Sequence, residues 1–382
     1  MRALTLWIWI VVLLLVVLLG VRAGGHRGPV SVAAESNRPT MPVASVPSSA
    51  AAFDIAGDPG LVRFVREQER SIRYPKEDDG EAIEHWRNQM ITRLRLLFDY
   101  KPVGTVVDHA VHESEVLGSV RRKLISYRVS DGTTIPAYVC EPIMSGKDRL
   151  GVLVIAGHGQ GIRGTVGLVD DYQHGAAMAL AVAGFVTITP ELRGFGMLGS
   201  DIDLDHRAVA YNALAAGRFY KAVIAADLQR AIDILQFWPG VNPSKLAVTG
   251  ASFGGEMAAT MAVLDDRLDC VAVSASGLYC GPVPPATGGR ADPRPHGCHL
   301  IPGGNALVHL EDWYRLIAPR PLLVVHGLRD VPPTAELFRK RVEHTYRHLG
   351  AEDRLTITIV DGFHEFHVRP TIDFLQSFDY ER

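Results

Sequence analysis

The 382-residue chain has little net charge and lacks the G-K-[ST] step of a P-loop. Its formal charge is −3, so no basic excess is present to attract a nucleic acid through its phosphates. G-K-[ST] does not occur, which argues against a P-loop that cradles a nucleotide. No internal repeat is visible either. What remains is a chain that is 47% hydrophobic and 21% charged, a composition that allows a large buried core.

Cysteine is scarce, with four residues in the whole chain. Cys140 and Cys270 lie in apolar runs, which predicts buried thiols. Cys280 and Cys298 share a Pro- and Gly-rich segment, and we expect a disulfide between them, which would add about 3 kcal/mol of stability in an oxidising compartment. A metal site at 296–299 (His-Gly-Cys-His) is the alternative. It is disfavoured because no second Cys-x-x-Cys or His-x-x-x-His element exists, so neither metal nor cofactor is expected.

The N-terminal region differs from the rest of the chain. Residues 3–21 carry no charge, and 19 residues is closer to the ~20 of a membrane span than to the ~7–15 of a signal-peptide core. Val21-Arg22-Ala23 loosely fits a cleavage site, so residues 1–23 are a signal peptide or a membrane anchor. Both interpretations predict an exported protein, secreted or membrane-anchored, with its catalytic domain outside the cytoplasm. Residues 24–52 have the composition of a disordered linker, and 53–382 form the expected catalytic domain.

The hydrophobic pattern from residue 151 onward predicts an α/β fold. Short continuous apolar runs alternate with helical segments, as in a parallel sheet covered on both faces. The predicted parallel strands are 152–156, 186–189, 246–249, 271–274, 322–326 and 355–360. They are preceded by antiparallel strands at 106–113, 120–130 and 134–141. Helices are predicted at 54–74, 81–98, 171–183, 218–237, 253–264, 334–349 and 370–380. The fold class is therefore a mostly parallel doubly wound sheet with antiparallel N-terminal strands, N-terminal helices and a loop-rich insertion (277–312) after the sixth strand, over the site.

Gly250-Ala251-Ser252-Phe253-Gly254 carries the clearest chemical signal. An apolar strand-like run precedes this G-x-S-x-G segment and a helix-like run of small residues follows it. In that context the pattern is typical of a nucleophile elbow, in which a tight turn lifts the serine hydroxyl above the sheet edge. The five residues alone would also fit an ordinary turn. The flanking strand and helix favour Ser252 as a nucleophile.

A serine nucleophile needs a base, and the base needs an orienting acid. Asp330 follows the predicted strand 322–326 and His364 follows 355–360, at strand ends where such groups gather. Asp361 is the alternative acid, but it is only three residues from His364. His367 is the alternative base. The expected catalytic residues are therefore Ser252, Asp330 and His364.

Two backbone amides are needed for an oxyanion hole. The Phe253 N–H follows the nucleophile and would supply one. The second is expected from Gly157-His158-Gly159-Gln160-Gly161, after the strand 152–156, and we assign it to the Gln160 N–H. A phosphate-binding loop is the alternative interpretation of these glycines, and it lacks the G-K-[ST] step of a P-loop.

As a set, these segments resemble the α/β-hydrolase superfamily, and more narrowly its acetyl xylan esterase and dienelactone-hydrolase-like branch. The resemblance covers roughly residues 130–380 and includes the segments 157–161, 191–196, 250–255 and 316–321. It implies the α/β-hydrolase fold and acyl transfer by Ser252, Asp330 and His364 without a metal. Dienelactone hydrolases proper use a cysteine nucleophile, so the serine here favours ester hydrolysis. Arg193 lies in one of the matched segments, where a structural turn residue is the preferred interpretation.

The expected function is hydrolysis of carboxylic esters, small or carbohydrate-borne, through an acyl-enzyme. A peptidase of the prolyl-oligopeptidase type shares the elbow and the order of the triad. It normally carries a propeller, and the ~100 residues before the sheet cannot hold one when a blade takes about 40–45. A non-catalytic binding module is the third possibility, and the presence of all three triad candidates argues against it. The acyl group, the alcohol and the oligomeric state are left open.

Overall fold

The computed structural model describes residues 70–76, 79–102, 104–144, 146, 148–199, 205–282 and 297–380. The apolar run 3–21, the predicted linker and all but the end of the predicted helix 54–74 lie outside these ranges. Within them, no helix is long and apolar enough to span a membrane.

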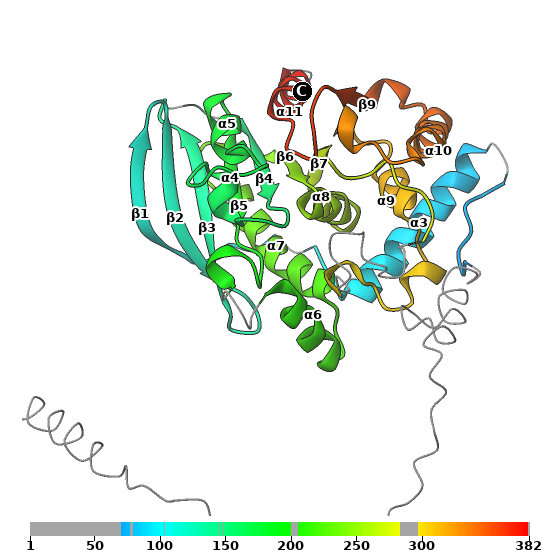
Figure 1. Cartoon of the computed structure of the whole chain (residues 1–382), viewed down its shortest axis with the longest axis horizontal. Coiled ribbons are helices and arrows are strands. Elements are labelled where there is room, and N and C mark those ends of the chain that lie inside the picture. Colours follow the sequence, from blue (N-terminus) through cyan, green and yellow to red (C-terminus); the bar gives the residue numbers. More distant parts are fainter. Residues whose placement is uncertain are drawn as a thin grey trace, which may run out of the picture. The chain divides into compact units, whose positions relative to one another are not determined.

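A single nine-stranded sheet forms the centre of the domain (Figure 1). Its spatial order is β1-β2-β3-β5-β4-β6-β7-β8-β9, with β1, β2, β3 and β5 paired antiparallel and all later pairs parallel. The strands are β1 (His109–Leu117), β2 (Val120–Arg128), β3 (Thr134–Pro142), β4 (Arg149–Ile155), β5 (Val186–Pro190), β6 (Val241–Ala251), β7 (Leu268–Ser274), β8 (Leu322–Gly327) and β9 (Leu355–Val360). This arrangement confirms the predicted fold class.

Three details differ from the prediction. The insertion follows β7, which is the seventh strand in chain order and not the sixth. Strand β1 begins at His109 and not at residue 106; every residue of this edge strand is exposed, so no burial pattern marks its ends. Strand β6 is longer than predicted, because an irregular pairing with β4 lets it continue through the polar residues around Pro243.

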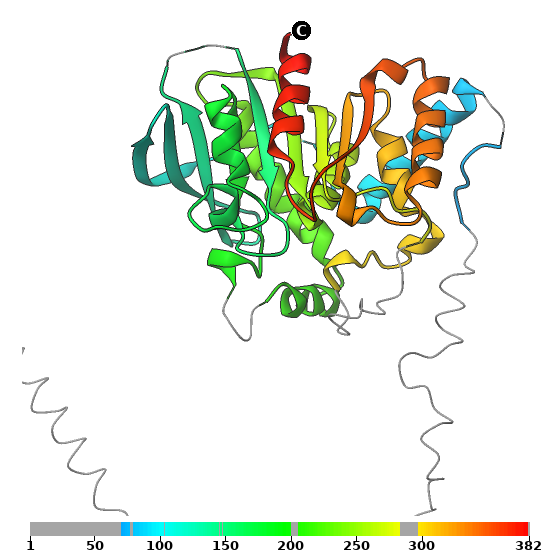
Figure 2. The same ribbon diagram turned by 45° about the horizontal axis from the view of Figure 1, so that its top comes forward.

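Helices cover both faces of the sheet (Figures 1 and 2). Alternate strand residues point to opposite sides, and each side has its own apolar cluster. The smaller cluster contains α5 (Ala176–Val182) and α11 (Val368–Tyr380). The larger contains α3 (Gly80–Phe98), α7 (Tyr220–Gln236), α8 (Phe253–Leu264), α9 (Leu310–Ile317) and α10 (Ala335–His348). This two-sided cover is the physical reason for the continuous apolar runs in the parallel strands.

Three α-helices have no counterpart in the sequence prediction, and the shortest of them is α4 (Ile162–Thr165). Helix α6 (His206–Ala215) buries only Ala210 and Ala213, so its apolar face is too weak to show as a periodic pattern. Helix α9 begins at Leu310, inside the segment predicted to be loop-rich, and His309 and Asp312 cap its first turn reciprocally. Of the predicted insertion, residues 277–282 and 297–312 are described.

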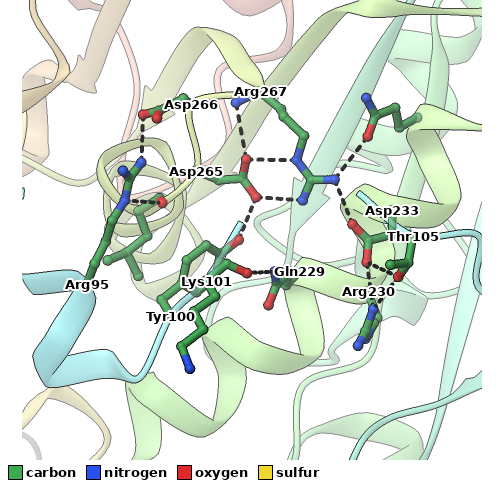
Figure 3. A network of polar contacts seen from close by, with 12 residues as sticks. Arg95, Tyr100, Lys101, Thr105, Gln229, Arg230, Asp233, Asp265, Asp266 and Arg267 are labelled. Carbon is green, nitrogen blue, oxygen red and sulfur yellow. Dashed lines mark hydrogen bonds and ion pairs between the residues drawn. The ribbon is translucent and has the colours of Figure 1, made fainter. Parts of the chain in front are cut away.

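The amino ends of β6 and β7 carry a dense ionic network (Figure 3). Asp265, fully buried between α8 and β7, accepts hydrogen bonds from Arg267 at 2.7 and 2.9 Å and from the Tyr100 hydroxyl at 2.6 Å. Arg267 also donates to Asp233 on α7 at 2.6 Å, and Arg230 donates to the second oxygen of Asp233 at 2.9 Å. Burial raises the pKa of the Asp265 carboxyl, but the hydrogen bonds and charge of Arg267 outweigh it and leave that pKa below its ordinary value. The network ties α3, α7 and α8 together.

Candidate active site

Ser252 occupies the strained turn between β6 and α8. Its backbone angles are φ 57° and ψ −124°, a positive-φ conformation that a residue with a side chain rarely adopts. The two flanking glycines are required by contact. A Cβ on Gly250 would lie 2.5 Å from the carbonyl carbon of Gly254, and a Cβ on Gly254 would strike the Ile155 carbonyl oxygen. The sequence therefore forms the elbow because only glycine permits this close approach of β6, α8 and β4.

The structure brings Asp330 and His364 together. Asp330 ends the short 3-10 turn after β8, and His364 lies in the loop after β9. Because β8 and β9 are parallel neighbours, these two loops leave the same edge of the sheet. His364 Nδ1 lies 2.8 Å from Asp330 Oδ2. The His364 side chain is 49% exposed, so its ring is open to a ligand.

Ser252 and His364 are not joined by a hydrogen bond in the described structure. Tyr172 lies between them: its ring centroid is 5.8 Å from that of His364, and its hydroxyl approaches the Gly157 backbone beside Ser252. The hydroxyl makes no well-formed hydrogen bond, and burial raises its pKa, although the nearby Ser252 hydroxyl partly offsets the rise. Catalytic hydrogen bonds are often long in free enzymes. The triad roles of Ser252, Asp330 and His364 therefore stay a prediction.

The segment 171–174 fixes the loop that carries His364. The Phe366 N–H donates to the Tyr172 carbonyl at 2.8 Å, and His174 Nε2 lies 2.8 Å from Glu365 Oε2. Glu365 also accepts the Phe363 N–H at 3.1 Å, which closes the loop on itself around His364. Tyr172 and His174 carry no motif in the sequence, so this support could not be found there.

The alternative acid and base have other contacts. Asp361 is 83% exposed and pairs with Arg329 at 2.8 Å. His367 is buried just before the start of α11. Its backbone N–H donates to Ser274 Oγ at 3.2 Å, and burial lowers the pKa of its ring. The sequence also missed His326, which is fully buried, lies 3.5 Å from Asp330 through Nδ1, and contacts the Ser276 carbonyl through Nε2. His326 therefore lies on the buried side of the Asp330 carboxylate.

The predicted oxyanion loop lies beside the elbow. Phe253 is the first residue of α8, and a first-turn N–H has no helical carbonyl to bond. The Gln160 N–H donates to Asp171 Oδ2 over a long 3.3 Å, so in this structure it is turned toward a carboxylate. Gln173 holds the loop from both ends: its Oε1 accepts the Gly157 N–H at 2.9 Å and its Nε2 donates to the Gly161 carbonyl at 3.2 Å. The oxyanion roles of Phe253 and Gln160 stay predictions.

Two charged residues stabilise the loops behind the site. Buried Glu191 accepts the N–H groups of Ile162 at 3.3 Å and Met197 at 2.9 Å, and burial raises the pKa of its carboxyl to about 7. Arg193 makes a two-pronged pair with Asp227, both bonds at 2.7 Å, and a third bond to Asp131 at 2.7 Å. With its donors engaged in this way, Arg193 has the structural role that the sequence favoured.

The predicted disulfide between Cys280 and Cys298 is not formed, and both are free thiols. They belong to different surroundings: the Cys280 N–H donates to Thr334 Oγ1 at 3.3 Å, whereas Cys298 Sγ lies 3.4 Å from His158 Nε2 in the predicted oxyanion loop. Closeness in sequence did not predict pairing, because Cys280 lies beside the start of α10 whereas Cys298 lies beside the start of α6. Beside Cys298, a cavity of about 450 Å³ is lined mainly by residues 158–160, residues 194–197 and His206.

Structural comparison places this architecture among esterases of the α/β-hydrolase fold. A protein of Bacteroides fragilis assigned as an acetyl xylan esterase aligns with a TM-score of 0.67 at 17% identity, over 79% of this chain and 81% of its own. The glucuronoyl esterase of Solibacter usitatus gives 0.53 at 14%, over 78% and 93%. The acetyl xylan esterase of Paenibacillus sp. R4 gives 0.52 at 18%, over 82% and 98%. At these identities the likeness establishes the fold.

No curated protein gives a significant match to the whole sequence. The model of the dienelactone hydrolase family matches residues 135–286, a stretch that runs from β3 through the elbow to the region after β7. Over this stretch the chain is similar to the dienelactone hydrolase family, and the similar solved structures share its fold.

Proposed function

We propose that this protein hydrolyses carboxylic esters through an acyl-enzyme on Ser252, with acetyl esters of carbohydrates as the favoured substrates. The observation that carries the proposal is the combination of a strained serine elbow with an Asp330–His364 hydrogen bond at the same edge of the sheet. A strained serine alone is a fold feature. A half-exposed imidazole oriented by a carboxylate at that edge supplies the base that the serine needs.

In the proposed reaction, the Ser252 hydroxyl oxygen attacks the ester carbonyl carbon and its proton passes to His364 Nε2. Asp330, bonded to Nδ1, holds the ring and stabilises the imidazolium. The tetrahedral intermediate collapses when the C–O bond to the alcohol breaks, and the alcohol leaves with the proton from His364. Water then gives a proton to His364, attacks the acyl carbon and releases the acid and Ser252.

The negative charge on the carbonyl oxygen would be met by the Phe253 and Gln160 N–H groups. Removing one such donor from an enzyme of this kind typically slows it by about 10²–10³. The long bond from Gln160 to Asp171 is a weak competitor, which a developing oxyanion would displace. The Gln173 contacts at both ends of the loop would keep the amide near this position during the exchange.

The proposed substrate class is supported by the similar solved structures and by the cavity. The similar structures include two acetyl xylan esterases, a glucuronoyl esterase and a methylesterase, all named for esters. The cavity of about 450 Å³ borders the predicted oxyanion loop and is large enough for a sugar residue beside the scissile bond. Export of the domain, which the N-terminal run predicts, would give it access to polysaccharide; fractionation of expressing cells tests that part.

The test uses p-nitrophenyl acetate and acetylated xylan, with Ser252→Ala as the null variant. Wild-type protein is expected to turn over both and to be labelled by a fluorophosphonate at Ser252, as mass spectrometry of the labelled peptide would show. Ser252→Ala should lose the label and at least about 10³-fold of kcat while keeping its circular dichroism. Aminoacyl-proline amides serve as the comparison for a peptidase. Turnover of those amides in preference to the esters, or absence of labelling at Ser252, would overturn the proposal.

A further inference from the structure

A set of nitrogen and sulfur donors lies beside the elbow and takes no part in the proposed reaction. His158, His206 and Cys298 each present one donor atom, and the three atoms all lie within 4.8 Å of one another. They come from three separate places in the chain: the loop after β4, the first residue of α6 and a short turn at 297–299 in the insertion. We propose that these three side chains bind Zn²⁺, or a divalent cation of similar ligand preference, and so join the insertion to the oxyanion loop.

The donor set and the spacing fit zinc. Imidazole nitrogen and thiolate sulfur are its usual ligands, at about 2.0–2.1 Å and about 2.3 Å, which places a nitrogen and a sulfur on one tetrahedral zinc about 3.6 Å apart. Cys298 Sγ and His158 Nε2 are separated by 3.4 Å. The rings of His158 and His206 lie 4.6 Å apart between centroids and are tilted by 59°, and one ring nitrogen of each lies within 4.8 Å of the other. Closing the set on a metal needs movements of about 1 Å or less.

The surroundings resemble the support that metal ligands usually have. His299 is next to Cys298, but its Nδ1 is taken by Glu256 at 2.6 Å, which leaves it outside the ligand set. Instead it makes a hydrogen bond to Cys298, a contact of the kind that orients a metal-bound thiolate. Glu256 is held in turn by the buried Lys221 amine. These contacts of His299, Glu256 and Lys221 hold the Cys298 side chain in place.

Three protein ligands leave one tetrahedral position, and the structure indicates where it faces. His158 and His206 both line the cavity of about 450 Å³, whereas Cys298 is fully buried. A cation bound here would therefore complete its shell with water from the cavity. The burial of Cys298 also argues against its service as a second nucleophile, because an attacking thiolate must reach its substrate.

The test is binding of Co²⁺, used as a spectroscopic substitute for Zn²⁺, to the full chain after treatment with a chelator. Wild-type protein is expected to take up one equivalent and to show the intense visible bands of tetrahedral cobalt together with a thiolate-to-cobalt charge-transfer band. Addition of Zn²⁺ should erase both. The same Zn²⁺ should raise the midpoint of thermal unfolding, because it binds the folded state alone.

Cys298→Ser and His206→Gln are the test variants, and Cys280→Ser is the matched control from the same insertion. Both test variants should bind Co²⁺ at least about 100-fold more weakly, and Cys298→Ser should lose the charge-transfer band. Circular dichroism without metal checks that each variant folds. If wild-type protein gives no thiolate–cobalt band, or if Cys280→Ser loses that band while Cys298→Ser keeps it, the site is a thiol–imidazole contact and the inference falls. Because the readout is the metal spectrum, this result is independent of whether the protein cleaves esters.

Discussion

The two ends of the parallel strands use the same residue types in opposite ways. At the amino ends, Asp265 is fully buried and accepts three hydrogen bonds from the side chains of Arg267 and Tyr100. At the carboxyl ends, Asp330 holds His364 through one bond of 2.8 Å, and the other ring nitrogen of that half-exposed histidine has no hydrogen-bond partner among the described residues. A carboxylate at the amino end is held by several fixed donors, whereas the one at the carboxyl end orients the histidine that we propose as the base.

Backbone strain also differs between the two ends of the strands. The carboxyl end contains Ser252 at φ 57° and Ala275 at φ 48°, each directly after a strand. The amino-end network contains no residue of this kind among Asp233, Asp265 and Arg267. From this difference we expect stability and chemistry to be separated along the strand direction in this domain. Substitutions at one end are therefore expected to change activity, and substitutions at the other to change stability.

Asp330→Asn should give the largest effect, a loss of about 10³–10⁴ in kcat toward p-nitrophenyl acetate. The amide can present an N–H to His364 Nδ1 and so favour the wrong tautomer of the base. Asp361→Asn is the control, because Asp361 is exposed and paired with Arg329. It should retain activity within about twofold, and both variants should unfold at nearly the wild-type urea concentration. Equal losses in the two variants would contradict the assignment of the acid.

Asp265→Ala tests the amino end and should cost about 3–5 kcal/mol of unfolding free energy, because it leaves Arg267 buried with half of its pairing gone. The pKa of Asp265 is lowered in the folded state, so its contribution is present above the unfolded pKa of about 3.9 and is lost as the pH falls below it. Urea unfolding at pH 7 measures the full loss of unfolding free energy, and unfolding at pH 3.5 shows how much of that loss depends on ionised Asp265. The kcat of the folded fraction should stay within about twofold.

Asp266→Ala is the control for this change, because Asp266 is the next residue but its side chain is 72% exposed and pairs with Arg95 at the surface. An exposed pair of this kind is worth about 1 kcal/mol or less. If Asp265→Ala were no more destabilising than Asp266→Ala, the amino-end network would not have the stabilising role described here.

The fold was predictable because its signals are local and additive. Helix α8 has the predicted bounds, 253–264, because its small residues and its glycine turn are set by contact with β6. The parallel strands were visible as apolar runs because both of their faces are covered. The residues named for the site were found at strand ends, where the topology alone brings them to one edge.

What the sequence could not give depends on contacts between distant segments. Tyr172 approaches both Ser252 and His364, yet nothing in its neighbours along the chain marks it. The Cys280–Cys298 disulfide was wrongly predicted because both cysteines lie in one irregular segment, whose path the sequence does not determine. The grouping of Cys298 with His158 and His206 has the same origin: three residues separated by 48 to 140 positions have no shared spacing to detect.

Glu191→Gln sharpens the comparison at the carboxyl end, where buried Glu191 has no cationic partner among the residues that the structure describes. Burial raises the pKa of Glu191 from 4.5 to about 7, so the folded state retains a proton that the unfolded state releases first. Wild-type stability should therefore fall by up to about 3 kcal/mol as the pH rises from about 4.5 to 7, and level off above that. In Glu191→Gln this part of the slope should vanish. Glu336→Gln, at a side chain that is 70% exposed, should keep the wild-type slope.

Ser252→Gly gives the smallest effect and the sharpest contrast with the amino end, because here removal of a side chain should stabilise the protein. A non-glycine residue in this backbone conformation costs about 1–3 kcal/mol, and glycine relieves that strain while losing about 0.5–1 kcal/mol of chain entropy on folding. Ser252→Ala keeps the Cβ and therefore the strain, so it is the matched reference, and both variants lack the nucleophile. Urea unfolding should place Ser252→Gly about 1 kcal/mol above Ser252→Ala. Equal stabilities would mean that the elbow relaxes once the hydroxyl is gone, and that the strain belongs to the side chain of Ser252 and not to the turn between β6 and α8.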